Sequence, residues 1–346
     1  MVPPSLSIVA AAYNSEKEIA VLFDSLIHST ERDFEVCLCD DGSTDGTLQK
    51  IESYRGRLDL RVIRNKTNLG VAAARNQALA LARAPLLLFL DADVRLYPDT
   101  ISCLRRGLNE TGADVFEGIY SPVALDGGLI SAYYAAFAHH SFLISDHPVA
   151  YNVFNAWCAL CRREAMDAVG GHAVTPKGVE VENEALGRKL VARGFKIMID
   201  PSIAVDHHWG GTSKVFFIFT RRVYWWVKTF FADGRRFELC LTTPSYGLGT
   251  AAFPAAAVLL AASVFNHWLI APAVFLAAAF AFAYVPFYRF ALRYKGPLFG
   301  LACLILSAAF SFVITASAAY SSAEELLSLA VKGRPSLDPA IFGSPS

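Results

Sequence analysis

Three short polar clusters lie in the first third of this 346-residue chain, each directly after an apolar run: Tyr13-Asn14, Asp40-Asp41-Gly42-Ser43 and Asp91-Ala92-Asp93. Asp91 and Asp93 offer two carboxylates at one point, and such oxygen ligands suit a hard cation such as Mg²⁺ or Mn²⁺. A cation held there would neutralise phosphate oxygens and improve a diphosphate as a leaving group. Asp41 can accept a hydrogen bond from a base or ribose, and the glycine beside it allows close approach to a ligand.

Strands and helices alternate around these clusters. Strands are predicted at 7–12, 34–39, 60–63 and 86–90, and helices at 16–28, 44–54 and 71–82. The run Leu86–Leu90 is apolar throughout, which is typical of a strand buried on both faces. This order predicts an α/β fold with a mainly parallel sheet, in which ligands bind beyond the carboxyl ends of the strands. The three clusters are therefore expected at one edge of the sheet.

Charge is absent from much of the C-terminal half. Overall, 31 basic residues balance 31 acidic ones, which argues against a nucleic-acid partner bound through a basic surface. No charged residue lies between Glu238 and Arg289, nor within Gly296–Ala323. Because a helical span needs about 20 apolar residues, we predict transmembrane helices at about 247–268, 270–288 and 297–320. The alternative, buried helices of a soluble core, is disfavoured because these runs have no polar face.

Basic residues beside the predicted spans indicate their orientation. They are Lys228, Arg235 and Arg236 before the first span and Arg289, Arg293 and Lys295 between the second and third. The positive-inside rule then predicts a multi-pass protein of the cell (inner) membrane with a cytoplasmic N-terminal domain. Three crossings would put the tail, 324–346, on the other side, although Lys332 and Arg334 argue against that placement. Residues 1–7 lack the pattern of a signal peptide, so none is expected.

Aromatic and basic residues are interleaved between the soluble part and the first span. Tyr224, Trp225 and Trp226 lie close to Arg221, Arg222 and Lys228. Rings at the acyl boundary and cations on lipid phosphates suit the headgroup layer. The predicted organisation is therefore a soluble domain over 1–210, interfacial amphipathic helices over 211–244, transmembrane helices over 245–323 and a tail.

Over residues 5 to about 210 the chain resembles family 2 glycosyltransferases, which have the GT-A (Rossmann-like) fold. The matching segments are 9–14, 40–47, 68–70, 74–76, 89–93, 161–164, 169–171 and 194–195, with Pro201 and His207. The resemblance implies a nucleotide-sugar donor, UDP- or GDP-linked, bound by Ala11, Tyr13, Asn14, Asp41, Gly70, Arg75, Asp91 and Ala92. It also implies a metal site made by Asp93, Asp91 and His207, with His208 as a substitute for His207.

The sequence departs from the family pattern at the position of the general base. Family members usually carry a Glu-Asp pair before a helix, and here the pair falls at Glu182 and Asn183. An asparagine cannot take a proton from a hydroxyl at neutral pH, so Glu182 is expected to act, with Glu184 as the alternative. If the acceptor is an ionised phosphate, no strong base is needed and Asn183 could orient it. The same glutamates would also arise without catalysis, because acids stabilise a helix N-terminus.

These observations predict a membrane-anchored, inverting, metal-dependent glycosyltransferase that moves one sugar to a lipid-linked acceptor. The acceptor is either a glycan hydroxyl or a polyprenyl phosphate. Residues 220–226 only partly match the Gln-x-x-Arg-Trp motif of processive members, which favours single-sugar transfer. The alternative is a catalytically silent membrane scaffold that retains the fold. A channel or transporter is disfavoured, because the predicted spans contain no acidic or basic residue.

Overall fold

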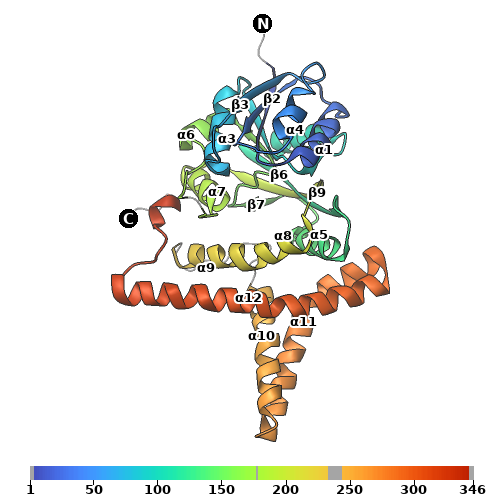
Figure 1. Cartoon of the computed structure of the whole chain (residues 1–346), viewed down its shortest axis with the longest axis vertical. Helices are drawn as coiled ribbons and strands as arrows, with labels where there is room; N and C mark the ends of the chain where they lie inside the picture. The colour runs from blue at the N-terminus through green and yellow to red at the C-terminus, as the bar shows by residue number, and fades with distance from the viewer. Residues whose placement is uncertain (1–3, 177, 233–243, 343–346) are drawn as a thin grey trace. The chain divides into compact units, whose positions relative to one another are not determined.

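The computed structural model describes residues 4–176, 178–232 and 244–342 (Figure 1). The chain divides into two compact units. The first comprises Met1–Ser121, Ile144–His208 and Ala340–Ser346, and the second comprises Pro122–Leu143 and Trp209–Pro339. Arg235 and Arg236, which support the predicted orientation, lie outside the described residues.

A nine-stranded sheet forms the centre of the first unit. Its order is β3-β2-β1-β4-β8-β6-β9-β5, with β7 paired to β9 (Figure 1). The strands are β1 (Leu6–Ala12), β2 (Phe34–Asp40), β3 (Leu60–Arg64), β4 (Leu86–Asp91), β5 (Val94–Arg95), β6 (Val115–Ala124), β7 (Val149–Tyr151), β8 (Cys158–Arg162) and β9 (Ile197–His207).

The first four strands of the chain are parallel, as the alternation of strands and helices predicts. Strand β1 lies between β2 and β4, so that Ala12 pairs with Asp40 and Ala11 pairs with Asp91. Ile8 and Phe89 are fully buried, because helices cover both faces of this part of the sheet. The predicted α/β class is confirmed, and the second and third polar clusters lie on either side of the end of β1, which the first cluster follows.

The remaining strands make the sheet mixed. Strand β8 is antiparallel to both β4 and β6, and β9 is antiparallel to β5 and β7. Along β9 buried residues such as Ile199 and Val205 alternate with less buried ones. This period of two is typical of an antiparallel strand with one covered face. The prediction of strands ended at residue 90 and therefore missed this half of the sheet.

Helices of the first unit cover the sheet. They are α1 (Glu16–Ile27), α2 (Thr47–Glu52), α3 (Val71–Leu81), α4 (Thr100–Thr111), α6 (Arg163–Val169) and α7 (Glu182–Ala192). Helix α1 buries Ile19, Leu22, Phe23 and Leu26, the face that its spacing predicts. Helix α2 is shorter than predicted, because Asp45 accepts hydrogen bonds from the backbone and hydroxyl of Thr47 in the preceding turn.

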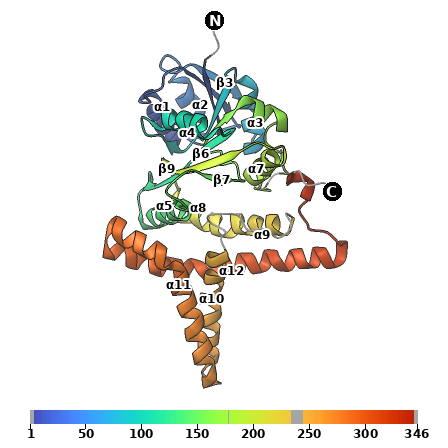
Figure 2. The same ribbon diagram turned by 180° about the vertical axis from the view of Figure 1, so that it is seen from behind.

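The second unit is helical (Figure 2). It contains α5 (Leu129–Phe142), α8 (Gly211–Phe217), a π-helical turn η1 (Ile218–Arg222), α9 (Val223–Ala232), α10 (Pro244–Ala262), a short 3-10 turn η2 (His267–Leu269), α11 (Ile270–Lys295) and α12 (Pro297–Lys332). Tyr133 of α5 stacks on Phe310 of α12, and Phe137 meets Phe287 of α11 edge to face. Segments His267–Lys295 and Pro297–Lys332 are long and apolar enough to cross a membrane, and α10 contains a shorter apolar stretch.

Two boundaries differ from the predicted organisation. Residues 122–143 were expected in the soluble domain, but α5 packs with the C-terminal helices through its buried aromatic face. Helix α12 continues to Lys332 and so includes residues 324–332, where a tail was expected. The helix continues because Glu325 is buried and bonded within the second unit, which gives this polar segment a tertiary partner.

Glu35 provides a test of how the sheet is held together. It is fully buried in β2, and it accepts hydrogen bonds from Ser7 (2.7 Å) and from the backbone (2.8 Å) and guanidinium (2.8 Å) of Arg83. Burial alone would raise the pKa of Glu35, but the hydrogen bonds from Arg83 and Ser7 outweigh it and hold the pKa below its ordinary value.

Glu35→Ala should therefore lower the free energy of unfolding by about 3 kcal/mol, because the buried Ser7 hydroxyl and the backbone and guanidinium donors of Arg83 lose their acceptor. The pKa is lower in the folded state, so the stabilisation is present above the unfolded pKa and is lost as pH falls through the folded one. Denaturation of wild type and variant between pH 3 and 7 measures this, and a difference in stability that grows towards low pH would contradict it.

Candidate active site

Asp91, Asp93 and His207 come together where β4 and β9 end. One ligand atom of each lies within 4.8 Å of the others. The His207 Nε2 atom is 3.2 Å from Asp93 Oδ1, and strand pairing places His207 opposite Val94. The structure therefore brings the three predicted metal-binding residues into one cluster. The substitute, His208, points elsewhere, because its Nε2 atom lies 3.8 Å from Glu18.

This cluster fits a divalent cation. It combines two carboxylates with one imidazole, and these side chains lie close together although His207 is far from Asp91 and Asp93 in the sequence. The His207 side chain is 8% exposed, whereas those of Asp91 and Asp93 are 27% and 21% exposed. Partly exposed carboxylates leave coordination positions for water or phosphate oxygens, as Mg²⁺ and Mn²⁺ require. The imidazole makes Mn²⁺ the better match of the two, because nitrogen ligands bind it more readily than they bind Mg²⁺.

Arg75 connects the metal cluster to the residues predicted as catalytic. It is buried in α3, and its Nη2 atom lies 2.5 Å from Asp91 Oδ1. Its Nη1 atom lies 3.5 Å from Asn183 Oδ1 and 3.9 Å from Glu182 Oε1. One guanidinium thus faces both the end of β4 and the first turn of α7. Glu184 is buried in the same turn.

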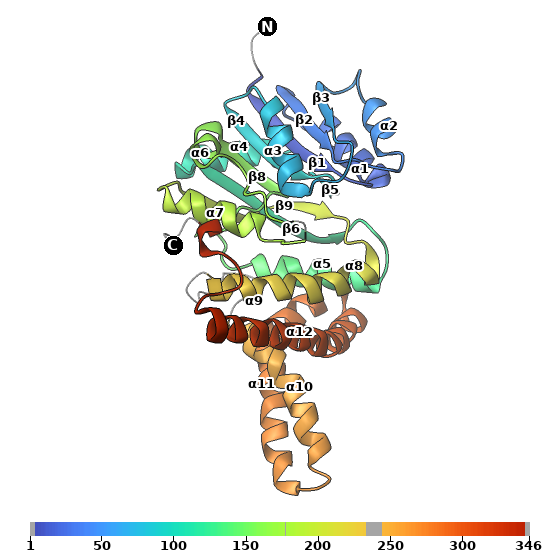
Figure 3. The ribbon, with the colours of Figure 1, turned by 60° about the vertical axis from the view of Figure 1, so that its left-hand side comes forward.

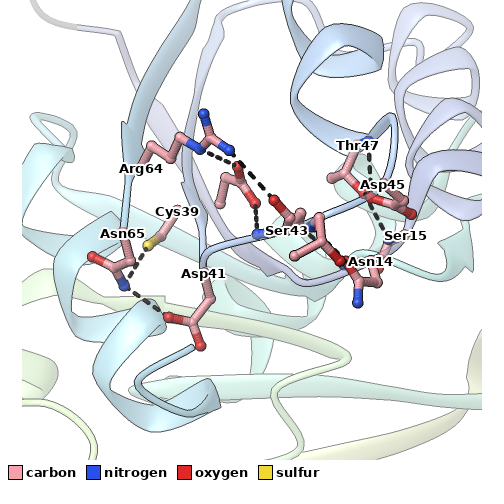
Figure 4. A network of polar contacts seen from close by, with 11 residues as sticks. Asn14, Ser15, Cys39, Asp41, Ser43, Asp45, Thr47, Arg64 and Asn65 are labelled. Atoms are coloured by element: carbon pink, nitrogen blue, oxygen red, sulfur yellow. Dashed lines mark hydrogen bonds and ion pairs between the residues drawn. The ribbon is translucent and has the colours of Figure 1, made fainter. Parts of the chain in front are cut away.

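Asp41 is held by the loop that follows β3 (Figure 4). Its Oδ1 atom accepts hydrogen bonds from Asn65 Nδ2 (2.8 Å) and Leu69 N (2.9 Å), and its Oδ2 atom accepts one from Gly70 N (2.9 Å). Asp41 is 2% exposed, so the carboxylate positions this loop as well as facing the strand edge. The sequence analysis missed Asn65; its place directly after the third parallel strand is the signal that could have found it.

Further hydrogen bonds join the loops after β1 and β2 (Figure 4). Asn14 N donates to Ser43 Oγ (3.0 Å), and Asn14 Oδ1 accepts from Thr44 N (2.9 Å). Asn14 adopts a left-handed backbone conformation, with φ of 49°. Tyr13 remains 46% exposed beside these bonds. Ala11 and Ala92, the other two predicted residues, lie at the ends of β1 and β4, where a larger side chain would narrow the site.

Two buried titratable groups behind the site stay neutral. Burial, aided by the charge of Arg75, holds the pKa of His172 well below its ordinary value. Its ring packs against Phe89 and Phe154. Burial, with the charges of Asp41 and Asp40, raises the pKa of the Cys39 thiol to about 12. These groups shape the floor of the site, and neither is suited to act as a charged base or nucleophile.

An aromatic pair adjoins His207 that the sequence analysis did not identify. Tyr120 of β6 lies edge-on to the His207 ring, with centroids 4.9 Å apart, and stacks on Trp157 at 4.4 Å. Tyr120 lies in the antiparallel half of the sheet, and Trp157 directly precedes β8. No local pattern in the sequence indicates that Tyr120 contacts a histidine 87 positions later.

Comparison with known proteins identifies the family of the domain that carries this site. Residues 7–169 match the family described as "Glycosyl transferase family 2". This match covers just under half of the chain and identifies a family 2 glycosyltransferase domain in its N-terminal part. The strands that carry Asp41, Asp91 and Asp93 all lie within the matched residues, and His207 lies beyond them.

Two curated relatives illustrate the sequence similarity. The chondroitin synthase of Pasteurella multocida is 36% identical over 129 residues, which are 37% of this chain and 13% of that protein. The poly(ribitol-phosphate) beta-N-acetylglucosaminyltransferase TarS of Staphylococcus aureus is 38% identical over 112 residues, which are 32% of this chain and 20% of that protein. The match to this chain therefore covers a small part of the length of either relative.

A solved structure extends the likeness to most of the chain. The mannosyltransferase PcManGT of Pyrobaculum calidifontis, in complex with GDP-Man and Mn²⁺, superposes with a TM-score of 0.56. The comparison covers 96% of this chain and 88% of that one, at 18% identity. At this identity the likeness establishes the fold, and the predicted GT-A class is confirmed.

A substitution at Gly42 tests whether the loop after β2 must approach the backbone of the loop after β3 closely. Its φ is +76°, and a Cβ atom there would lie 2.7 Å from the backbone carbon of Thr67. Gly42→Ala should therefore lower the free energy of unfolding by about 2 kcal/mol. Gly56→Ala is the matched control, because nothing lies within 4 Å of the added atom. Chemical denaturation of both variants measures this, and equal effects would show that the close approach of the two loops is not required.

Proposed function

We propose that this protein is a membrane-anchored, inverting glycosyltransferase that moves one sugar from a nucleotide-sugar to a lipid-linked acceptor. The observation that carries the proposal is the meeting of Asp91, Asp93 and His207 beside Arg75 in a family 2 domain. The relatives support the reaction class, since the solved mannosyltransferase holds GDP-Man and Mn²⁺ and TarS is named for transfer of N-acetylglucosamine.

On the donor side, different residues would bind the base, the ribose and the diphosphate of the nucleotide-sugar. The exposed ring of Tyr13 can stack on a base, and Asp41 can accept a hydrogen bond from a base or ribose. Asp91, Asp93 and His207 would hold Mg²⁺ or Mn²⁺, which neutralises charge on the departing diphosphate. Arg75 adds a fixed positive charge on the same side, because its guanidinium is buried and held by Asp91.

On the acceptor side, Glu182 is our choice for the general base. Inversion requires the acceptor oxygen to attack the anomeric carbon opposite the bond to the diphosphate. The new glycosidic bond forms as that carbon–oxygen bond breaks, and the acceptor proton passes to the Glu182 carboxylate. Asn183, held 3.5 Å from Arg75, can orient the acceptor but cannot take the proton.

The apolar helices explain why the acceptor would be lipid-linked. We propose that they anchor the enzyme in the cell (inner) membrane with its catalytic domain on the cytoplasmic face. Arg221 and Arg222, close in sequence to Tyr224 and Trp225, suit a headgroup layer. Anchoring confines enzyme and acceptor to one surface, which replaces a three-dimensional search by positioning.

Asp93→Ala tests the metal site. Transfer should fall by at least about a hundredfold, because the cation that stabilises the leaving diphosphate loses a ligand. Stabilisation of the full chain by Mn²⁺ with UDP or GDP, read as a thermal shift, should be lost as well. Asp146→Ala is the control, because that side chain is 99% exposed, and it should keep both properties. Full activity of Asp93→Ala in the presence of a chelator would refute the metal site, and absence of donor hydrolysis in wild type would favour a silent scaffold.

Glu182→Gln tests the acceptor class. The substitution keeps the size of the side chain but removes its ability to take a proton. Transfer to a hydroxyl should fall by about 10²- to 10⁴-fold, whereas transfer to a polyprenyl phosphate, already ionised, should be little changed. Glu184→Gln, assayed with the same two acceptors, compares the two glutamates. A loss with Glu184→Gln and none with Glu182→Gln would move the base to Glu184.

A further inference from the structure

Helix α12 has its polar residues on the inside and its apolar residues on the outside. Ser307, Ser311, Ser321 and Glu325 are buried within the second unit. The opposite face is exposed and apolar along its whole length, with Leu298, Leu301, Ile305, Phe312, Leu326 and Leu327. A helix on the surface of a soluble protein has the reverse arrangement, so this outer face requires an apolar medium.

The inner face of α12 is bonded to a basic, aromatic helix. Ser321 Oγ donates to Tyr224 O (2.9 Å), Lys228 Nζ donates to Glu325 Oε1 (2.8 Å), and Ser317 donates to the Thr220 carbonyl. The partners are 97 residues apart in every case, so the η1–α9 segment and α12 run parallel. Figures 1 and 3 show α9 and α12 side by side, with the α10–α11 hairpin running across them.

This pairing makes it costly for α12 to cross the bilayer. If α12 stood upright, the parallel neighbour would enter the bilayer with it, carrying Arg221 and Arg222. A basic side chain at the bilayer centre costs about 3 kcal/mol or more. Lying flat, the same residues fall in the headgroup layer, where cations and aromatic rings are favourable.

The α10–α11 hairpin has the features of the inserted part. Helix α10 has 19 residues and is about 28 Å long, close to the thickness of a hydrocarbon core. The turn at its end exposes Val264, Phe265 (93%) and Trp268. Beyond Pro286, α11 carries Arg289, Arg293 and Lys295, so the chain has returned to a polar region before α12 begins. The hairpin therefore accounts for one crossing and one return.

The last described residues belong to the first unit. Phe342 is 2% exposed there, and the Arg188 guanidinium lies 5.6 Å from the centre of its ring. A chain that leaves a soluble unit and returns to it crosses the membrane an even number of times. With α10 and α11 making two, α12 makes none.

We propose that α12 lies along the surface of the bilayer with its outer face at the boundary of headgroups and acyl chains. The C-terminal end of the chain is then on the same side as the catalytic domain. This replaces the third span expected at 297–320. The proposal rests on the membrane anchoring in the proposed function but not on the sugar transfer itself.

Nitroxide labels on the outer face test the proposal. Leu301, Phe312 and Leu326 point in similar directions, and the first and last are 25 residues, or about 38 Å, apart along the helix. Each is replaced singly by Cys in the full chain, with Cys103 and Cys240 changed to Ser. The chain is reconstituted in phosphatidylethanolamine–phosphatidylglycerol vesicles. The depth of each label in the bilayer is measured from how often the label collides with oxygen, which enters the bilayer, and with a water-soluble nickel complex, which does not. Phe265→Cys at the hairpin turn is the reference for an inserted position.

A flat helix gives three labels at one shallow depth. An upright helix puts Phe312 near the midplane and the other two near opposite interfaces, which would overturn the proposal. Epitope tags at both chain ends should become accessible on the same side, and tags on opposite sides would also overturn it. Extraction of the chain by alkaline carbonate would refute the anchoring and this proposal together, whereas donor hydrolysis measured on the same sample reports separately on the enzyme.

Discussion

Strand β1 is hydrogen-bonded between β2 and β4, and this parallel pairing determines where the polar groups of the chain meet. Because Ala12 pairs with Asp40 and Ala11 with Asp91, two aspartates 51 positions apart in the sequence lie at the same edge of the sheet. Strand β9 then brings His207 to Asp93 from the other half of the sheet. The hydrogen bonds of Asp41 and the ion pair of Arg75 with Asp91 hold the surrounding loops, so the proposed donor site depends on backbone register.

A second constraint acts on the helical unit. Its helices bury Ser321, Lys228 and Glu325 against one another and expose leucine and phenylalanine. Buried charges are tolerated here because each has a partner, as Lys228 has in Glu325 at 2.8 Å. In the proposed arrangement the medium that favours these exposed apolar side chains is lipid, and the return of the chain to its first unit limits how the helices would enter it. For an enzyme proposed to act on a lipid-linked acceptor, such a flat helix would hold the second unit against the surface that presents the acceptor.

Much of this could be predicted from the sequence, for reasons that differ between regions. Leu86–Leu90, buried on both faces, and the polar residues that follow each strand predict the parallel half of the sheet and the site edge. The antiparallel half was missed in part because Pro201 lies within β9, and a proline inside a run argues against a strand. Asn65 and Tyr120 were missed because their roles come from tertiary contacts. The third span was predicted from apolar content, and α12 is long and apolar enough to match it. Apolar content does not report the tilt of a helix, so the flat orientation proposed above could not be predicted from it.

The central claim is that Asp91, Asp93 and His207 form one cation site. Electron spin-echo spectroscopy of Mn²⁺ bound to the full chain tests it most directly, because it detects nitrogen bonded to the ion. The account predicts one Mn²⁺ per chain, with imidazole nitrogen coupling in wild type that disappears in His207→Gln and persists in His208→Gln. Bound Mn²⁺ without nitrogen coupling, or coupling that survives His207→Gln, would contradict it.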